Sequence, residues 1–475
     1  MDRWHVRSGF ARLLIALFAF SSGASLAQIR TIDRIDGKFR ESVDQISKQV
    51  LATTGVPSAS IAIVVNGQIA YVQAYGDASV EPRVPARPHM RYSIGSISKQ
   101  FTATAILLLA EQHKLSLEDP ISRFFPTLTR ANEVTIRELL SHTSGYRDYW
   151  PQDYVPPFML SDTTSEQILD RFARTPLDFD PGTQWQYSNT NFVIAGLIVE
   201  KVSGMPLLNF LAERVFTPLG MKSIANVDAG RLGETDATGY LRYALGPPRI
   251  APKEAKGWLF AAAELGMTAQ NLAEWDIAMM NRRLLQPASY KEMQSEVLLK
   301  DGRSTRYGLG IGIRSEGGHR ILAHGGEVSG FGSENIVFPD DQASVTVLTN
   351  VDMSDAASEI SQRIAGLLFV PEQQGEQKNQ QQIEKIFQQF QRGTIDRSLF
   401  TANANSYFNQ QAVADFAEGL APLGTPQEFT QTEREDRGGM IFRRYSVKFG
   451  QKTLDLWIRQ MPDGKIEQYQ IAVKP

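Results

Sequence analysis

A serine followed three residues later by a lysine is the first feature of this chain that could do chemistry. The motif Ser96-Ile97-Ser98-Lys99 opens an apolar run that ends near Glu111. On a helix the lysine returns to the face of the serine after one turn. A lysine that is kept from water can take the proton of a serine hydroxyl, which is otherwise a weak nucleophile. The pattern also arises by chance, and a serine before a helix is a common cap.

A second motif contributes a phenol and an amide. Tyr187 and Asn189 stand just before another predicted helix, over 190–202. A tyrosine can relay protons, and an asparagine amide can hold a substrate carbonyl. The same pattern recurs at Tyr407, where we interpret it as chance, so the weight of this motif comes from its place in the chain.

A third motif is rich in glycine. His324 begins the sequence His-Gly-Gly, which is predicted to lie at the end of a strand. Glycines such as Gly326 let a substrate backbone lie close to the strand. The N–H of Glu327 could then pair with that of Ser96 as an oxyanion hole.

The elements expected around these motifs build one domain from both ends of a long segment. A β-hairpin is predicted over 58–75, turning at Asn66-Gly67, and the apolar helix 97–111 follows. The stretch 112–220 is predicted to be helical, with a capping box at Thr135. Strand patterns and a closing helix follow at 307–314, 320–323, 333–338, 344–349 and 356–368. We therefore expect a two-lobed α/β (α+β) fold, in which an antiparallel sheet is flanked by helices and a helical lobe of about 96–220 is inserted.

The first residues indicate export. Three arginines precede the apolar run 13–20, and Ser25-Leu26-Ala27 follows it, which is the pattern of a signal peptide over 1–27. The alternative, a membrane anchor, needs a longer apolar run. We expect a periplasmic or secreted bacterial protein with no integral membrane span after cleavage, and a main domain over 28–370.

The C-terminal part of the chain has a different character. A glutamine-rich linker is expected over 371–382, and a small α+β domain over 383–475, with strands near 440–449, 453–459 and 467–473. The order of its elements resembles small NTF2-like folds. Such folds host many functions, so we expect an accessory module.

Composition excludes several classes of protein. The 475 residues are 42% hydrophobic with a net charge of −3, which does not fit a disordered chain or a nucleic-acid binder. The absence of cysteine excludes disulfides and thiol catalysis. The six histidines contain no His-x-x-x-His pair, so no metal or other cofactor is expected.

The order of the three motifs resembles the serine β-lactamase and penicillin-binding protein superfamily. It is most similar to the class C-like branch, which includes D-alanyl-D-alanine carboxypeptidases, D-aminopeptidases and β-lactamase-like esterases. The stretches 92–95, 135–145, 181–182 and 265–275 are similar to that branch as well, and the resemblance covers about residues 35–370. His142 lies within the second stretch, and we interpret it as a structural turn residue.

The resemblance implies a role for each motif. Ser96 attacks a carbonyl and becomes acylated, while Lys99 and Tyr187 share the acid and base work, with the group that takes the serine proton left open. Asn189 orients the substrate, and the N–H groups of Ser96 and Glu327 stabilise the oxyanion. Water then releases the acyl group.

The chain departs from the family pattern at His324. Most members carry Lys-Thr-Gly there, whose lysine and hydroxyl hold the substrate carboxylate, whereas histidine is mostly neutral at pH 7. The hypothesis is therefore an exported acyl-serine hydrolase that turns over β-lactams poorly and acts on peptides, amides or esters. These would include peptidoglycan-derived substrates. The alternative is a catalytically silent sensor that binds penicillin or peptidoglycan in the same pocket.

Overall fold

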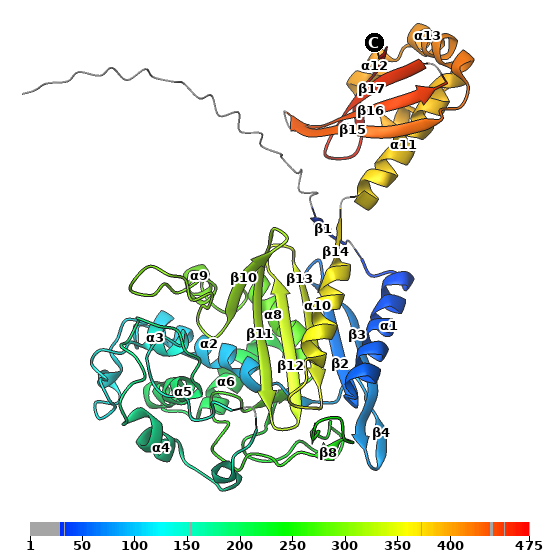
Figure 1. Cartoon of the computed structure of the whole chain (residues 1–475). Coiled ribbons are helices and arrows are strands. Elements are labelled where there is room, and N and C mark those ends of the chain that lie inside the picture. Colours follow the sequence, from blue (N-terminus) through cyan, green and yellow to red (C-terminus); the bar gives the residue numbers. More distant parts are fainter. Residues whose placement is uncertain are drawn as a thin grey trace, which may run out of the picture. The chain divides into compact units, whose positions relative to one another are not determined.

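The computed structural model describes residues 29–32, 34–152, 154–371, 373–437, 440–450 and 452–474 (Figure 1). It divides into two compact units, Ile29–Val370 and the part of the chain from Pro371 onward. The signal peptide expected over 1–27 lies outside the described residues.

The larger unit is built on a seven-stranded antiparallel sheet with the order β10-β11-β12-β13-β2-β3-β4. Its strands are, in that order, Gly312–Glu316, His319–Val328, Phe331–Phe338, Ala343–Thr349, Ser58–Val65, Gln68–Val80 and Arg83–Pro85. The predicted hairpin is confirmed as β2–β3. Asn66 and Gly67 turn the chain with φ angles of 52° and 68°, which these two residue types tolerate. As predicted, strands from both ends of the unit form the sheet.

Side chains on β2 alternate between two hydrophobic cores, because the strand is buried on both faces. Ile61 and Ile63 face a core shared with α1 (Gly37–Thr54) and α10 (Ala356–Leu368). Ala62 and Val64 face the core that contains α2 (Ser98–Glu111) and α8 (Ala269–Met280). Helices therefore cover both faces of the sheet, as expected for this fold class (Figure 1).

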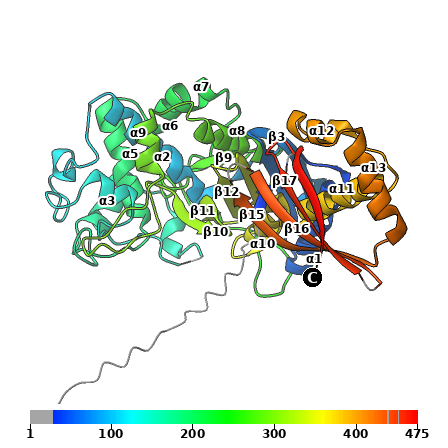
Figure 2. The ribbon, with the colours of Figure 1, turned by 90° about the horizontal axis from the view of Figure 1, so that it is seen from above.

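Helix α2 is the centre of the helical lobe. It is buried along nearly its whole length, as its apolar sequence predicts. Helices α5 (Asn189–Ser203) and α6 (Leu207–Leu211) pack against it (Figure 2). The other helices of the lobe are α3 (Ile136–Leu140), α4 (Ser165–Ile168) and α7 (Thr217–Leu219). The predicted capping box at Thr135 is confirmed, and α5 ends at Gly204, which has a φ of 72°. Among the described helices, none alone has the length and hydropathy to cross a membrane; α5 meets that test only jointly with Leu207–Leu219, across a bend of 72°.

Short elements complete this unit. They are the three-stranded sheet of β5 (Tyr92–Ser93), β9 (Leu265–Met267) and β6 (Ala225–Asn226), the pairs β1 (Ile29–Thr31) with β14 (Phe369–Pro371) and β7 (Tyr240–Leu241) with β8 (Arg249–Ile250), and helix α9 (Pro287–Met293).

Two strand predictions around the glycine-rich motif were wrong in their bounds. The strand expected over 307–314 begins only at Gly312, because Gly310 has a φ of 73°, a left-handed angle outside the strand region, and packs against the Lys99 carbonyl. β11 runs on to Val328, well past the expected end at 323. His324 therefore lies inside β11 and not at its end: it pairs with Asn335 of β12, whereas the pairing of β11 with β10 ends at Ala323.

The C-terminal unit is a four-stranded antiparallel sheet with helices on one face. It contains α11 (Gln373–Gln391), α12 (Ala402–Tyr407), α13 (Gln410–Leu420), β15 (Glu428–Arg437), β16 (Met440–Phe449), β17 (Lys452–Gln460) and β18 (Ile466–Val473). Most of the glutamine-rich segment 371–382, predicted as a linker, belongs to α11, since glutamine is a good helix former. Sequence reasoning also missed β15, whose charged residues hide the strand pattern.

Candidate active site

Ser96 and Lys99 lie together at the start of α2. Ser96 is half-buried in the tight turn 95–97 that leads into the helix, and Lys99 is fully buried. The Lys99 Nζ lies 2.9 Å from Ser96 Oγ, 2.7 Å from Asn189 Oδ1 and 3.0 Å from the Ala262 carbonyl oxygen. Three acceptors match the three protons of an ammonium, and a neutral amine at the same place can accept the serine proton.

The two candidate bases are affected in opposite senses by burial. Burial lowers the pKa of Lys99 to about 7, against a smaller opposing effect of the Asp148 carboxylate. Burial raises the pKa of Tyr187 above its usual value, although its hydrogen bond with Ser96 acts in the other direction. Near neutral pH a large fraction of Lys99 is therefore uncharged, while the Tyr187 phenol keeps its proton.

Asp148 is a site residue that sequence reasoning missed. Its Oδ1 accepts the backbone N–H of Asn189 at 2.9 Å, and its Oδ2 accepts Asn189 Nδ2 at 3.3 Å. Because the amide nitrogen is committed to Asp148, the Oδ1 of Asn189 must face Lys99. No spacing pattern marks Asp148, since the loop after α3 brings it to the start of α5 only in the fold.

His142 supports the segment that carries Tyr187. It is buried with a φ of 60°, its Nδ1 accepts the Ser188 N–H at 3.2 Å, and its ring lies 4.2 Å from the Tyr187 ring. Burial, together with the charge of Lys99, lowers its pKa, which suits an accepting Nδ1. The geometry fits the structural role expected for it, and the residue it supports belongs to the site.

The strand β11 lies against the turn that carries Ser96, with no room for a side chain between them. A Cβ on Gly95 would lie 2.6 Å from the Glu327 backbone nitrogen. A Cβ on Gly326 would lie 2.9 Å from the Ile94 carbonyl carbon and closer still to its oxygen. A hydrogen bond stabilises this contact, since the Ser333 hydroxyl donates to the Ile94 carbonyl oxygen at 2.9 Å. The amides of Ser96 and Glu327 are thereby brought to neighbouring positions.

His324 is held in its neutral form. Its Nδ1 donates to the Gly325 carbonyl at 2.5 Å, so its Nε2 accepts the Tyr307 hydroxyl at 2.8 Å. Burial and the charge of Lys99 lower its pKa to about 4. Tyr307 was not singled out from the sequence, because its segment was predicted to be an ordinary strand.

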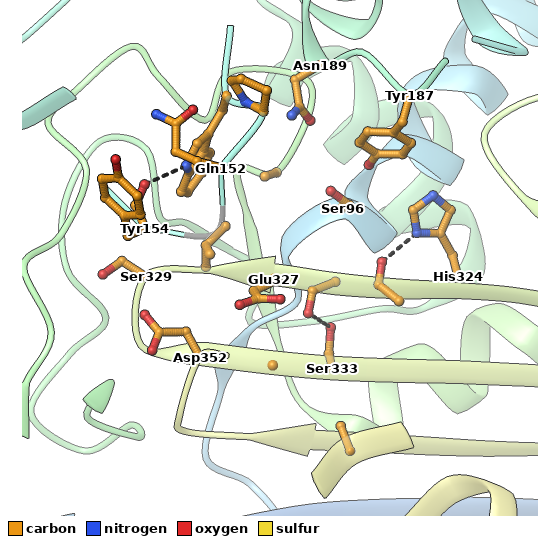
Figure 3. A pocket seen from close by; sticks show the side chains of 18 of the residues that line it. Ser96, Gln152, Tyr154, Tyr187, Asn189, His324, Glu327, Ser329, Ser333 and Asp352 are labelled. Carbon is orange, nitrogen blue, oxygen red and sulfur yellow. Dashed lines mark hydrogen bonds between the residues drawn. The ribbon is translucent and has the colours of Figure 1, made fainter. Parts of the chain in front are cut away.

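A cavity of about 660 Å³ opens over these groups (Figure 3). Six of the seven residues predicted from the sequence line it, and Lys99 lies beneath. The six are Ser96, Tyr187, Asn189, His324, Gly326 and Glu327. Within the described part of the chain, no group of three or more His, Cys, Asp or Glu residues is arranged to hold a metal ion.

Comparisons with known proteins agree with this geometry. The family model described as Beta-lactamase matches residues 43–367. A penicillin-binding protein of Bacillus subtilis (strain 168) is 27% identical over 370 residues, which are 73% of this chain and 78% of that protein. A D-aminopeptidase of Brucella anthropi is 26% identical over 315 residues, which are 66% of this chain but only 59% of the relative.

A solved structure shows the same fold. The D-stereospecific amidohydrolase from Streptomyces sp. is similar with a TM-score of 0.59 and 26% identity, over 67% of this chain and 96% of that one. The family match spans both the serine–lysine turn and the strand that faces it. The chain belongs to the beta-lactamase family, on the branch of serine hydrolases that includes penicillin-binding proteins and D-aminopeptidases.

Proposed function

We propose that this protein is an exported hydrolase that cleaves a peptide, amide or ester carbonyl through an acyl-serine intermediate. The observation that carries the proposal is the buried Lys99 amine at 2.9 Å from the Oγ of Ser96, a residue that lines an open cavity. Export is supported by the pattern of residues 1–27.

The reaction follows from the positions of the groups. The neutral amine of Lys99 takes the hydroxyl proton as Ser96 Oγ attacks the substrate carbonyl. The oxyanion accepts hydrogen bonds from the N–H groups of Ser96 and Glu327. Tyr187 passes a proton to the leaving group, the carbonyl reforms as an ester of Ser96, and Lys99 returns its proton to the phenol. Water then attacks the ester by the same route and releases the acid.

The group at position 324 argues against efficient β-lactam turnover. A neutral His324, bonded to Tyr307, supplies no positive charge for a substrate carboxylate. Substrates that have no carboxylate at this place do not need a positive charge at position 324. The printed names of the similar proteins, a D-aminopeptidase and a D-stereospecific amidohydrolase, point to amide substrates.

Labelling with a fluorophosphonate tests the nucleophile. We expect an adduct on Ser96 that is lost in Ser96→Ala and retained in Ser98→Ala, the adjacent serine, whose Oγ accepts the Leu265 N–H. The absence of any Ser96-dependent adduct would overturn the proposal.

A hydrolysis panel tests the substrate class. It spans nitrocefin, short-chain p-nitrophenyl esters, D-alanyl-D-alanine peptides and D-amino-acid amides. We expect turnover of an ester or amide and little turnover of nitrocefin. Nitrocefin hydrolysis as efficient as that of dedicated resistance enzymes would contradict the substrate assignment, and stable acylation without turnover of any compound would favour a sensor.

The mature N-terminus tests export. Mass spectrometry of the protein from a periplasmic or medium fraction should find a chain that begins at Gln28. Full-length protein confined to the cytoplasmic fraction would contradict export without touching the enzymatic assignment.

A further inference from the structure

Two acceptors direct the amine of Lys99 towards the nucleophile. A neutral amine has two N–H donors and one lone pair. Lys99 Nζ lies 2.7 Å from Asn189 Oδ1 and 3.0 Å from the Ala262 carbonyl oxygen, and neither oxygen carries a proton. With both N–H groups directed to these oxygens, the lone pair faces Ser96 Oγ at 2.9 Å. Asp148 orients the first acceptor, and the position of the second depends on the backbone around Ala262.

The Ala262 carbonyl belongs to a turn with an unusual backbone conformation. Ala261 has a φ of 58°, in the left-handed region that residues with a Cβ rarely adopt. The Ala262 N–H donates to the Phe260 carbonyl at 2.6 Å, which closes the turn tightly. Backbone in such a conformation persists only where its surroundings hold it. The place of the second acceptor for Lys99 is therefore set by the other contacts of this turn.

Two helices of the lobe contribute contacts to the turn. The Thr102 hydroxyl, on the same helix α2 as Lys99, donates to the Ala261 carbonyl at 2.7 Å. On α5, Gly196 lies so close to the turn that a Cβ there would collide with the side chains of Ala261 and Phe260. These contacts hold the carbonyl group and the side chain of Ala261, while its N–H needs an acceptor of its own.

That acceptor is the buried carboxyl group of Glu264. The residue is 4% exposed, and its Oε1 accepts the Ala261 N–H at 3.1 Å. The backbone of Glu264 is itself held, because its carbonyl accepts the Val227 N–H at 2.8 Å. The N–H of the next residue, Leu265, donates to Ser98 Oγ of α2 at 3.2 Å. Glu264 is not among the described residues that line the active-site cavity, so it can act on the reaction only through the turn.

We propose that Glu264 is a positioning residue for the general base, because it holds the turn that presents the Ala262 carbonyl to Lys99. The inference rests on the proposed function, in which the neutral amine of Lys99 accepts the serine proton. Without the hydrogen bond from Glu264, the Ala261 N–H is buried and unpaired, and the turn relaxes from its left-handed angle. The Ala262 carbonyl then moves away, and the lone pair of Lys99 is no longer directed at the nucleophile.

Two substitutions of Glu264 test this role, since Glu264→Leu removes the acceptor and Glu264→Gln keeps it. Burial raises the pKa of Glu264 to about 8, so the carboxyl group is mostly protonated at pH 7 and glutamine resembles it in shape and charge. The measurement is the rate at which a fluorophosphonate inactivates the protein, because this reagent reacts with the serine in a single step. In Glu264→Leu the rate should fall about tenfold, since a well-placed base contributes roughly 10²–10⁴-fold and only its direction is disturbed. In Glu264→Gln the rate should stay within about twofold of the parent protein, because the hydrogen bond is kept.

The pH profile of the same inactivation distinguishes positioning from a general loss of stability. An acceptor beside an ammonium favours the charged form, so displacement of the Ala262 carbonyl lowers the pKa of Lys99 further. The midpoint of the profile should move to lower pH by about half a pH unit or more in Glu264→Leu, and should stay in place in Glu264→Gln. The other titratable groups around Lys99 are the same in both variants, and they are Asp148, His142, His324 and Tyr187.

Glu200→Leu is the matched control. Glu200 is half-buried on α5, and its Oε1 accepts the Leu207 N–H at 2.9 Å. The same substitution therefore removes an acceptor from a backbone N–H that is not part of the turn. Its rate and its midpoint should stay close to those of the parent protein, and thermal melts establish that each variant is folded.

The outcomes separate the two proposals. A folded Glu264→Leu protein with the rate and midpoint of Glu200→Leu would overturn the positioning role, and so would a Glu264→Gln protein that is as impaired as Glu264→Leu. Thr102→Val removes the other side-chain hydrogen bond of the turn and should change both quantities in the same sense. Parent values in a folded Thr102→Val protein would overturn the inference even if Glu264→Leu does not fold. Failure of Ser96 to form any adduct in the parent protein would instead overturn the proposed function itself.

Discussion

Replacing Gly326 with alanine tests the oxyanion hole most directly. A Cβ at this position would lie 2.9 Å from the Ile94 carbonyl carbon, whereas non-bonded carbons settle about 3.5–4.0 Å apart. The strand and the serine turn must therefore separate by roughly 0.5–1 Å, since both are backbone and neither can rotate away. The Glu327 N–H moves with the strand, out of line with the oxyanion.

The size of the effect follows from the value of one donor. Removing a single oxyanion-hole donor costs about 10²–10³ in kcat, or roughly 2.7–4 kcal/mol. We expect Gly326→Ala to lower kcat for p-nitrophenyl acetate about 100-fold, with a smaller change in KM, because the lost interaction strengthens only in the transition state.

Gly325→Ala is the matched control. It makes the same chemical change one residue earlier, on the other face of β11, where the nearest atom is the flexible end of Glu334 at 3.3 Å. Its kcat should stay within about threefold of the parent protein. Thermal melts establish that both variants are folded. A folded Gly326→Ala protein with kcat close to that of Gly325→Ala would refute the assignment of the Glu327 amide.

Three further results are expected. The pH profile of kcat/KM should rise with pH through a midpoint near 7, because only the neutral form of Lys99 accepts the serine proton; a profile flat from pH 5 to 9 would contradict this. Asp148→Asn removes the carboxylate that opposes the lowering of the Lys99 pKa, so this midpoint should move to lower pH, and an unchanged or higher midpoint would show that the two groups are not coupled. Burial raises the pKa of Asp276 to about 7, so the folded state holds a proton that the unfolded chain releases near pH 4, and stability falls as pH rises between these values. Asp276→Asn should therefore raise the Tm at pH 8 and have little effect at pH 4. The free energy of unfolding at pH 8 should rise by at most a few kcal/mol, since one pKa unit corresponds to about 1.4 kcal/mol. An equal effect at both pH values would contradict the raised pKa.

The parts of the fold set by local chemistry could be predicted from the sequence. Asn66-Gly67 imposes a hairpin turn, and the apolar run after Ser96 can only be a buried helix. The spacing of Ser96 and Lys99 predicts that their side chains meet after one turn, and Lys99 Nζ lies 2.9 Å from Ser96 Oγ.

Groups that meet through tertiary contacts could not be predicted in this way. Asp148, Tyr307 and Ser333 reach the site on three separate segments, and none belongs to a repeated spacing. The start of β10 near Gly310 was predicted wrongly for the same reason, since the left-handed φ angle of Gly310 follows from its packing against α2. Polar contacts over long sequence separations leave no local periodicity to detect.

The pairing of β13 with β2 has a consequence for when the protein can fold during its synthesis. Val345 lies opposite Ile63, so the centre of the sheet joins residues from the two ends of the large unit. Contacts of such long range form late and slowly, because a large loop must close before they contribute. A growing chain therefore has no complete sheet until β13 has been synthesised, and no shorter N-terminal fragment can hold β11 against the serine turn. The site can therefore form only after the whole domain has been synthesised, and under the proposed export this order keeps the chain open until it has crossed the membrane.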